Sequence, residues 1–320
     1  MVLLLRWINE VPLKLFEGRE IWVDEPAKAF ISRTGKYVCY IDGDVVYVWD
    51  ANSGSLLASK KLDFKPSRDR IDCGNDILVL AKKNDILLFS LPSIVEILRI
   101  SRAHNKICSV GFTYDMKRIV SVGKDGVKVW SLDGALIRET NRVKCRAVAY
   151  DPEAELMAFR EKDSIIVYDL RREIDVESEK TYFIFHESIV KDEALMFIHK
   201  HRLLICLDTV LDSGFECDVL DVYCLEPITP LARIILPSML STIRYFPDKE
   251  TVIITNTHNI NYILKLPSLE LGFIRITDDA IPESFPAAFD ATIIGDKIRI
   301  VGSTKEKSGD RLFVLDYRFQ

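Results

Sequence analysis

The segment of residues 119–131 reads IVSVGKDGVKVWS and contains the clearest structural pattern in this chain. Apolar and polar residues alternate on both sides of a short Gly-Lys-Asp-Gly turn, which is the pattern of two half-buried antiparallel strands. The second strand ends on an aromatic residue between a valine and a serine, Val129-Trp130-Ser131. The segment therefore predicts a tight β-hairpin with a large side chain near one end.

This ending recurs along the chain as a short triplet with a large central residue. It occurs seven times, centred on Trp49, Phe89, Trp130, Tyr168, Tyr223, Leu264 and Leu315. Successive centres, called markers below, are 40, 41, 38, 55, 41 and 51 residues apart. Four intervals lie near the roughly 40–45 residues of a four-stranded propeller blade, and two are long enough for insertions. We therefore predict an all-β fold in one domain, residues 1–320: a seven-bladed β-propeller.

A second recurring element lies upstream of the markers. Polar turns between apolar strands include Gly35, Met116 and Ala154, each 14 residues before its marker. Further turns follow the markers and lead into another short strand. Each blade is thus predicted to contain four strands, the third of which carries the marker.

One repeat resembles the WD40 family residue by residue. His104 precedes its first strand, Ser121 lies on the second, Asp125 in the next turn and Trp130 on the third. The resemblance implies that these four side chains form a structural hydrogen-bonded set, and that Trp49 has the place of Trp130 in the first blade. Four residues separate Asp125 from Trp130, one fewer than usual in the family. The resemblance implies a ring of WD40-like blades.

The two ends of the chain are expected to meet in the last blade. The seventh marker strand ends near Gln320, so this blade lacks its outermost strand, whereas Val11–Phe16 reads as a spare strand before the first blade. We expect the N-terminal strand to close the ring by pairing with the last blade, at an edge where Pro12 is tolerated.

The amino-acid composition argues against DNA-binding, membrane-spanning and secreted proteins. Hydrophobic residues make up 48% and charged residues 28%, with a net charge of −5, which indicates a globular chain with no general affinity for DNA. No apolar run reaches the ~18 residues of a membrane span, and no secretory signal is visible. We therefore expect a cytoplasmic protein with no membrane partner. Gln320 is the only glutamine, a depletion of thermolabile amides that is typical of thermophiles.

Catalytic signatures are absent from the sequence. It contains no phosphate-binding loop, no GxGxxG, no GxSxG and no HExxH motif, so we expect no enzyme activity and no cofactor. A propeller enzyme that uses acids or a metal at the mouth of the channel is a further alternative.

Two clusters of side chains are candidate metal sites. His199-Lys200-His201 has metal-ligand spacing but no visible third ligand, so a polar turn in blade five is favoured. An acidic insertion in the same blade has no calcium-loop spacing, and the favoured interpretation is a solvated loop whose charges keep an exposed hairpin from pairing with neighbours. Its carboxylates are Asp208, Asp212, Glu216, Asp218 and Asp221.

The seven cysteines form no CxxC pair. Cys73, Cys108 and Cys145 lie near the first strands of three successive blades, where we expect them to pack as small apolar side chains. Cys206, Cys217 and Cys224 lie within one blade, and the sequence leaves open whether two of them form a disulfide.

Basic residues concentrate in blades two to four. Residues 60–170 hold 20 basic and 16 acidic side chains, and the rest of the chain holds 23 and 32. The loops that enter these blades and the turns between their second and third strands are expected to share one face. They define the predicted basic arc: Lys65, Arg68, Arg70, Lys82, Lys83, Arg102, Lys106, Lys124, Arg142, Lys144, Arg146 and Lys162.

The basic arc suggests a function in binding. We expect a scaffold that mediates protein–protein interaction and takes an acidic or phosphorylated partner. The alternative is an RNA- or ribosome-associated propeller that binds the phosphate backbone. A third reading is that these lysines and arginines merely coat a solvated surface.

Overall fold

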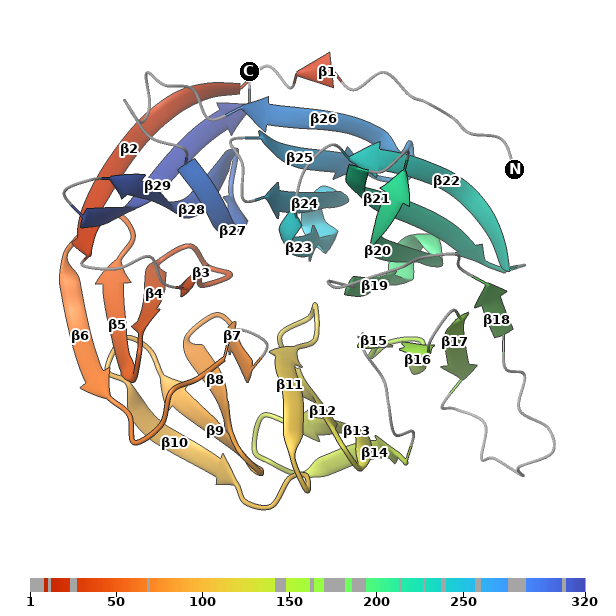
Figure 1. The fold of residues 1–320 in the computed structure, drawn as a ribbon, viewed down its shortest axis with the longest axis horizontal. Helices are drawn as coiled ribbons and strands as arrows, with labels where there is room; N and C mark the ends of the chain where they lie inside the picture. Colours follow the sequence, from red (N-terminus) through yellow and green to blue (C-terminus); the bar gives the residue numbers. More distant parts are fainter. Residues whose placement is uncertain are drawn as a thin grey trace.

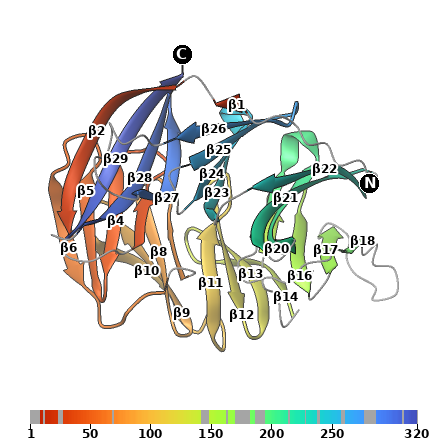
Figure 2. The ribbon, with the colours of Figure 1, turned by 45° about the horizontal axis from the view of Figure 1, so that its top comes forward.

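Seven small antiparallel sheets surround a central axis in the computed structural model, like the blades of a propeller (Figure 1). The structure describes residues 9–10, 13–23, 28–67, 70–141, 148–161, 164–169, 182–185, 194–212, 215–226, 228–236, 240–256, 260–275, 286–306 and 309–319. In the tilted view the sheets stand side by side around the ring (Figure 2). The predicted seven-bladed β-propeller is confirmed.

Blades one to six follow the chain from the innermost to the outermost strand. Blade one contains β3–β6 (Lys28–Ile31, Tyr37–Asp42, Val45–Asp50, Leu56–Lys61). Blade two contains β7–β10 (Ile71–Cys73, Ile77–Lys82, Asp85–Ser90, Val95–Ile100). Blade three contains β11–β14 (Ile107–Phe112, Arg118–Gly123, Gly126–Ser131, Leu136–Thr140). Blade four contains β15–β18 (Val148–Asp151, Leu156–Glu161, Ser164–Asp169, Tyr182–Phe185).

Among the described strands, the longest lie in blades five and seven. Blade five contains β19–β22 (Ala194–Ile198, Leu203–Asp212, Phe215–Leu225, Ile228–Leu236). Blade six contains β23–β26 (Leu240–Phe246, Thr251–Asn256, Ile260–Lys265, Glu270–Arg275). Blade seven contains β27–β29 (Pro286–Ile294, Lys297–Glu306, Gly309–Phe319) and takes its outermost strand from the N-terminal part of the chain. Among the described residues, no helix is long and apolar enough to cross a bilayer.

The N-terminal strand closes the ring, as the sequence predicts. Strand β2 (Leu13–Val23) pairs antiparallel with β29, from Leu13 opposite Phe319 to Val23 opposite Asp310. The strand is longer than the predicted Val11–Phe16 and begins two residues later. A preceding short strand, β1 (Asn9–Glu10), pairs in parallel with β26 of blade six, which the sequence did not predict. The N-terminal part of the chain thus contacts two neighbouring blades.

All seven markers lie on the third strand of their blades. Each described marker side chain packs against the preceding blade: Trp130 with Val79 and Leu88 of blade two, and Tyr223 with Ala158 and Val167 of blade four. Trp49, Phe89, Leu264 and Leu315 make the equivalent contacts, although Trp49 is only half-buried. The backbone of Tyr168 lies on β17, and its side chain is outside the described part. The repeat in the sequence is therefore the repeat of an interface between blades.

Blade five differs from the predicted solvated loop. The insertion lengthens β20 and β21 into a hairpin that is paired from Leu203 opposite Cys224 to Asp212 opposite Phe215. Asp218 and Asp221 are buried, and Asp221 accepts hydrogen bonds of 2.7 and 2.8 Å from Arg233 on β22. The expectation of a solvated segment is wrong for Asp218 and Asp221, because both lie buried on a paired strand and Arg233 binds the Asp221 carboxylate. The side chains of Asp208, Asp212 and Glu216 lie outside the described part.

The cysteine prediction holds in part. Cys73 is fully buried, whereas Cys108 is exposed, so the prediction is wrong for Cys108. A β-bulge explains the difference: Ile107 lies opposite Gly123 and Ser109 opposite Val122, so Cys108 has no partner residue in the ladder. Cys206 and Cys224 are both free thiols. Cys145 and the side chain of Cys217 lie outside the described residues.

Candidate functional site: the basic face of blades two and three

Two sets of loops meet on one face of the ring. The turn between β8 and β9 lies beside the segment that enters blade three, since Ile107 N donates to Lys83 O at 2.8 Å and His104 N to Asn84 O at 3.3 Å. Within blade three, Lys124 N donates to Lys106 O at 3.0 Å. These backbone hydrogen bonds bring Lys83, Lys106 and Lys124 together, although 41 residues of sequence separate the first from the last.

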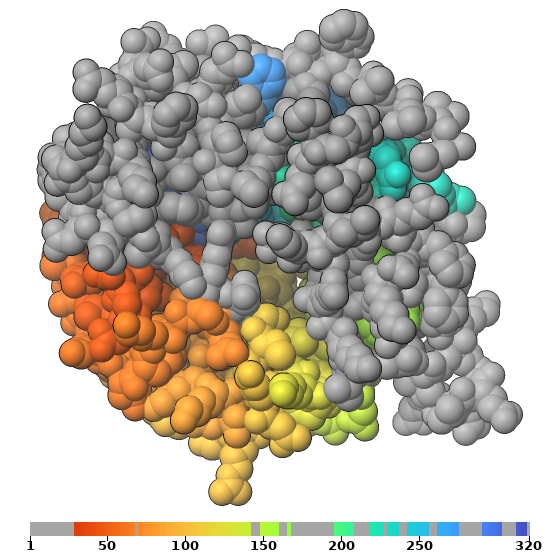
Figure 3. Space-filling view, viewed as in Figure 1, coloured from red at the N-terminus to blue at the C-terminus, as the bar shows by residue number. Residues whose placement is uncertain are grey.

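Five basic side chains of the predicted arc are exposed and unpaired. They are Lys65, Lys83, Arg102, Lys106 and Lys124. No ion pair joins any of them to another residue of the described part of the chain. We call these five residues the basic row. On the face shown in Figure 3, blades one to three form a continuous described surface.

Acidic residues of the same loops already have partners. Asp63 pairs with Lys82, and Asp85 pairs with Arg99 at 3.8 Å and accepts a 2.9 Å hydrogen bond from Arg102 N. Asp125 lies 2.7 Å from His104 Nδ1 and 3.6 Å from Lys128 Nζ. The basic row therefore carries positive charge that the neighbouring carboxylates do not neutralise.

The remaining residues of the predicted arc are paired, half-buried or outside the described residues. Lys82 pairs with Asp63 and lies 5.6 Å from the centre of the Phe64 ring. Arg70 is half-buried, and its Nε is buried with no hydrogen-bond partner in the part of the chain that the structure describes. Arg68, Arg142, Lys144, Arg146 and Lys162 lie outside the described residues. The described part of the arc lies on blades two and three.

Two exposed amides stand among these lysines and were missed in the sequence. Asn84 follows Lys83, and Asn105 precedes Lys106, and both are exposed. Amide side chains both donate and accept hydrogen bonds, so they can pair with the backbone of a bound peptide. Their position in the same loops as the lysines is the signal that could have identified them.

A buried hydrogen-bonded set holds these loops in place. Trp130 Nε1 donates to Ser121 Oγ at 2.8 Å, and Ser121 Oγ lies 2.8 Å from His104 Nε2. His104 Nδ1 lies 2.7 Å from Asp125 Oδ1. Each of the three contacts has one donor and one acceptor if His104 Nδ1–H donates to Asp125 and the Ser121 hydroxyl donates to His104 Nε2. The four residues named from the WD40 resemblance are thus joined in one chain of contacts.

Burial affects the charge of this histidine. His104 is 2% exposed, and burial lowers its pKa below the ordinary value of 6.5, although the carboxylate of Asp125 opposes the shift. A neutral imidazole is the form that accepts a hydrogen bond from Ser121. Gly123 makes room for the contact, because a Cβ there would lie 2.3 Å from His104 Nδ1 and 2.6 Å from Asp125 Oδ1.

The His199-Lys200-His201 segment forms a 3₁₀ turn between β19 and β20, as predicted. His199 Nδ1 lies 2.8 Å from Asp151 Oδ2, and His199 Nε2 lies 3.1 Å from Glu153 Oε2, both in blade four. Lys200 pairs with Glu250 of blade six. The turn therefore links three blades. Within the described ranges, no group of three or more His, Cys, Asp or Glu residues is arranged to hold a metal ion.

Comparison with known proteins adds no closer assignment. No protein-family model matches this sequence, and no curated protein matches it either. The structure therefore shows a seven-bladed β-propeller whose basic row, on blades two and three, has no ion pairs among the described residues.

Proposed function

We propose that this protein is a non-enzymatic scaffold of the WD40 type that binds an acidic or phosphorylated protein segment on the basic row. The observation that carries the proposal is the charge imbalance of one face: five exposed basic side chains have no ion pair among the described residues, while Asp63, Asp85 and Asp125 are engaged. Propellers commonly serve as interaction scaffolds, which is an argument from fold alone.

The WD40 assignment rests on blade three. The His104–Ser121–Trp130 contacts and the Asp125 contact reproduce the set that the resemblance implies. Because this set fixes the loop that carries Arg102 and Lys106, the basic row is presented on a rigid support. A preorganised surface loses less conformational entropy when it binds a partner.

A protein partner is favoured over RNA by the side chains of the face. Single-stranded RNA is bound by lysines and arginines together with exposed aromatic rings on which bases stack. The large exposed apolar side chains of the described residues are all aliphatic: Leu56, Leu57, Val95, Ile97, Leu136 and Leu231. Phosphate or carboxylate groups of a peptide can be bound by the cations of the basic row and the two amides, without an exposed aromatic ring.

Charge reversal on the row tests the proposal. In the triple variant Lys83→Glu, Lys106→Glu, Lys124→Glu, we expect the affinity for a peptide of phosphoserine and glutamate residues to fall at least about tenfold. The matched control reverses three exposed lysines in the turns between the first and second strands of blades one, three and six: Lys36→Glu, Lys117→Glu, Lys249→Glu. Fluorescence anisotropy with labelled peptide measures both variants and the parent.

A short single-stranded RNA serves as the competing probe. If the RNA binds more tightly than the peptide and its affinity falls steeply between about 50 and 200 mM salt, the RNA-binding alternative replaces the proposal. If neither probe distinguishes the row variant from the control variant, the lysines only coat the surface and the proposal is wrong.

A further inference from the structure

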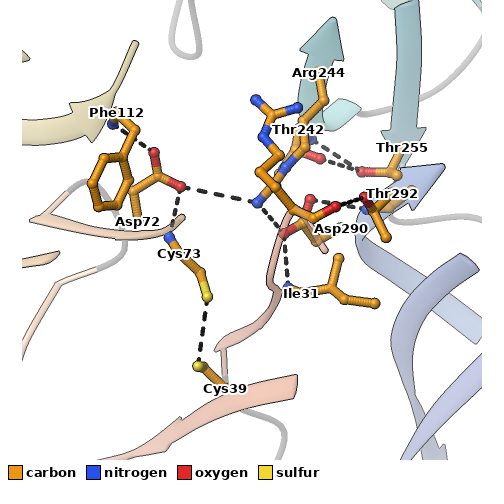
Figure 4. A network of polar contacts seen from close by, with 12 residues as sticks. Ile31, Cys39, Asp72, Cys73, Phe112, Thr242, Arg244, Thr255, Asp290 and Thr292 are labelled. Atoms are coloured by element: carbon orange, nitrogen blue, oxygen red, sulfur yellow. Dashed lines mark hydrogen bonds and ion pairs between the residues drawn. The ribbon is translucent and has the colours of Figure 1, made fainter. Parts of the chain in front are cut away.

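Two buried thiols from neighbouring blades contact each other. Cys39 lies on β4 of blade one and Cys73 ends β7 of blade two, and both are 0% exposed. Their Sγ atoms are 3.6 Å apart and point toward one another (Figure 4). A disulfide bond is about 2.05 Å long, so the two sulfur atoms have to approach by roughly 1.5 Å for a bond to form.

The backbone next to Cys73 is held from both sides. Arg33 N of blade one donates to Gly74 O at 3.0 Å. The Asp72 carboxylate accepts from Cys73 N and from Phe112 N of blade three, each at 2.8 Å. The two thiols also share one apolar cluster that spans blades one and two. Their proximity is therefore a property of the packed junction between the blades.

We propose that Cys39 and Cys73 are a site of oxidative modification, at which a low-molecular-weight disulfide converts the two thiols into a bond that links blade one to blade two. The thiolate of one cysteine attacks the small disulfide, forms a mixed disulfide and releases one small thiolate. The thiolate of the other cysteine attacks the protein sulfur of the mixed disulfide and releases the second. The released thiolates take up the two cysteine protons, and two electrons pass from the protein to the small disulfide.

The environment of the pair sets the rate of this reaction. The contact with Cys39 and burial raise the pKa of Cys73, so its reactive thiolate is rare at neutral pH. Exchange is therefore slow in the closed ring and faster at higher pH or when the blades part. Cys108 is exposed and provides a contrast within the same chain, because reagents reach it directly.

Mass spectrometry of the full chain tests the site. The Cys108→Ser protein is incubated with bis(2-hydroxyethyl) disulfide near pH ~8.5, the ordinary pKa of a thiol, then alkylated under denaturing conditions and digested without reduction. We expect a peptide pair joined through Cys39 and Cys73 that dithiothreitol separates. Because the bond closes a loop between residues 34 positions apart, we also expect Tm to rise by roughly 5 °C.

Oxidised and reduced samples are compared within each variant, since a buried substitution can itself destabilise the fold. The difference in Tm should disappear in Cys39→Ala and in Cys73→Ala and persist in Cys108→Ser. Recovery of Cys39 and Cys73 as separately alkylated peptides, even after oxidation in mild denaturant followed by refolding, would overturn the proposal. So would joining of either residue chiefly to another cysteine.

Discussion

Two buried polar networks stabilise this ring in different ways. The blade-three network joins His104, Ser121, Asp125 and Trp130, which lie within 27 residues of sequence. The axial network, on the inner strands, joins Asp72 of blade two, Arg244 of blade six and Asp290 of blade seven (Figure 4). Asp290 also accepts a 3.0 Å hydrogen bond from Ile31 N, which is 259 residues away in sequence.

The two networks differ in how well their polar atoms are matched. In blade three each of the three contacts pairs one donor with one acceptor. In the axial network Arg244 Nη1 and the nearby Arg33 Nε are buried without hydrogen-bond partners among the described residues. Burial, and then the charge of Arg244, lowers the pKa of Arg33 to about 9. Local hydrogen bonds thus hold one blade, whereas desolvated charges hold the junction of several blades.

The largest effect is expected in the axial network. Asp290→Ala leaves the buried Arg244 guanidinium with only the more distant Asp72 carboxylate, 3.9 Å away, and Ile31 N without its acceptor, so the free energy of unfolding should fall by about 4 kcal/mol. Denaturant titration measures the loss.

A double variant sharpens this prediction. Asp290→Leu with Arg244→Met removes both charges of the closest ion pair together and should recover part of the stability, because neither partner of that pair is left buried alone, although Asp72 and Ile31 N still lose their contacts. A double variant as unstable as Asp290→Ala would show that the ion pair is not what holds this junction.

A smaller effect is expected in blade three. Ser121→Ala removes the hydroxyl that accepts from Trp130 Nε1 and contacts His104 Nε2, so two buried groups lose a partner. The free energy of unfolding should fall by about 1–3 kcal/mol. The control is Ser93→Ala at an exposed turn, which should change it by less than about 0.5 kcal/mol. Equal losses in the two variants would contradict the structural role of the set.

The smallest effect concerns pH. The pKa of His104 is lower in the folded chain, so the unfolded chain takes up a proton more readily than the folded chain. The stability that the neutral, buried His104 contributes is therefore fully present above about pH 6.5 and is lost as the pH falls below that value. The loss is at most about 1.4 kcal/mol per pH unit. The decrease in Tm between pH 7 and pH 5.5 should be larger in the parent than in His104→Gln. Parallel pH profiles would show that other groups cause the decrease.

Several features of the fold could be predicted because they repeat or alternate locally. The markers identify the third strand of every blade, since each large side chain has to fill the gap to the preceding blade. Closure by an N-terminal strand could be predicted from the missing fourth strand of blade seven. The pairing of β1 with blade six could not, because two polar residues carry no periodic signal. Nor could the exposure of Cys108, which depends on a one-residue bulge.

The candidate site could be predicted only in part. The sequence identified the basic loops, but not which cations are neutralised: Lys82 and Lys83 are neighbours, yet the structure pairs Lys82 with Asp63 and leaves Lys83 exposed. A charge is neutralised through contacts in space, and sequence spacing reports these only within a turn or a hairpin.

The sequence by itself determined the number of blades and the strand that carries each marker, because both follow from short-range alternation and spacing. The hydrogen-bonded set of blade three was implied by the resemblance to WD40 repeats. Tertiary structure alone decided the axial network, the contact of Cys39 with Cys73 and the extent of the basic row. Each of these brings together groups from different blades, and their distances are fixed only when the ring closes.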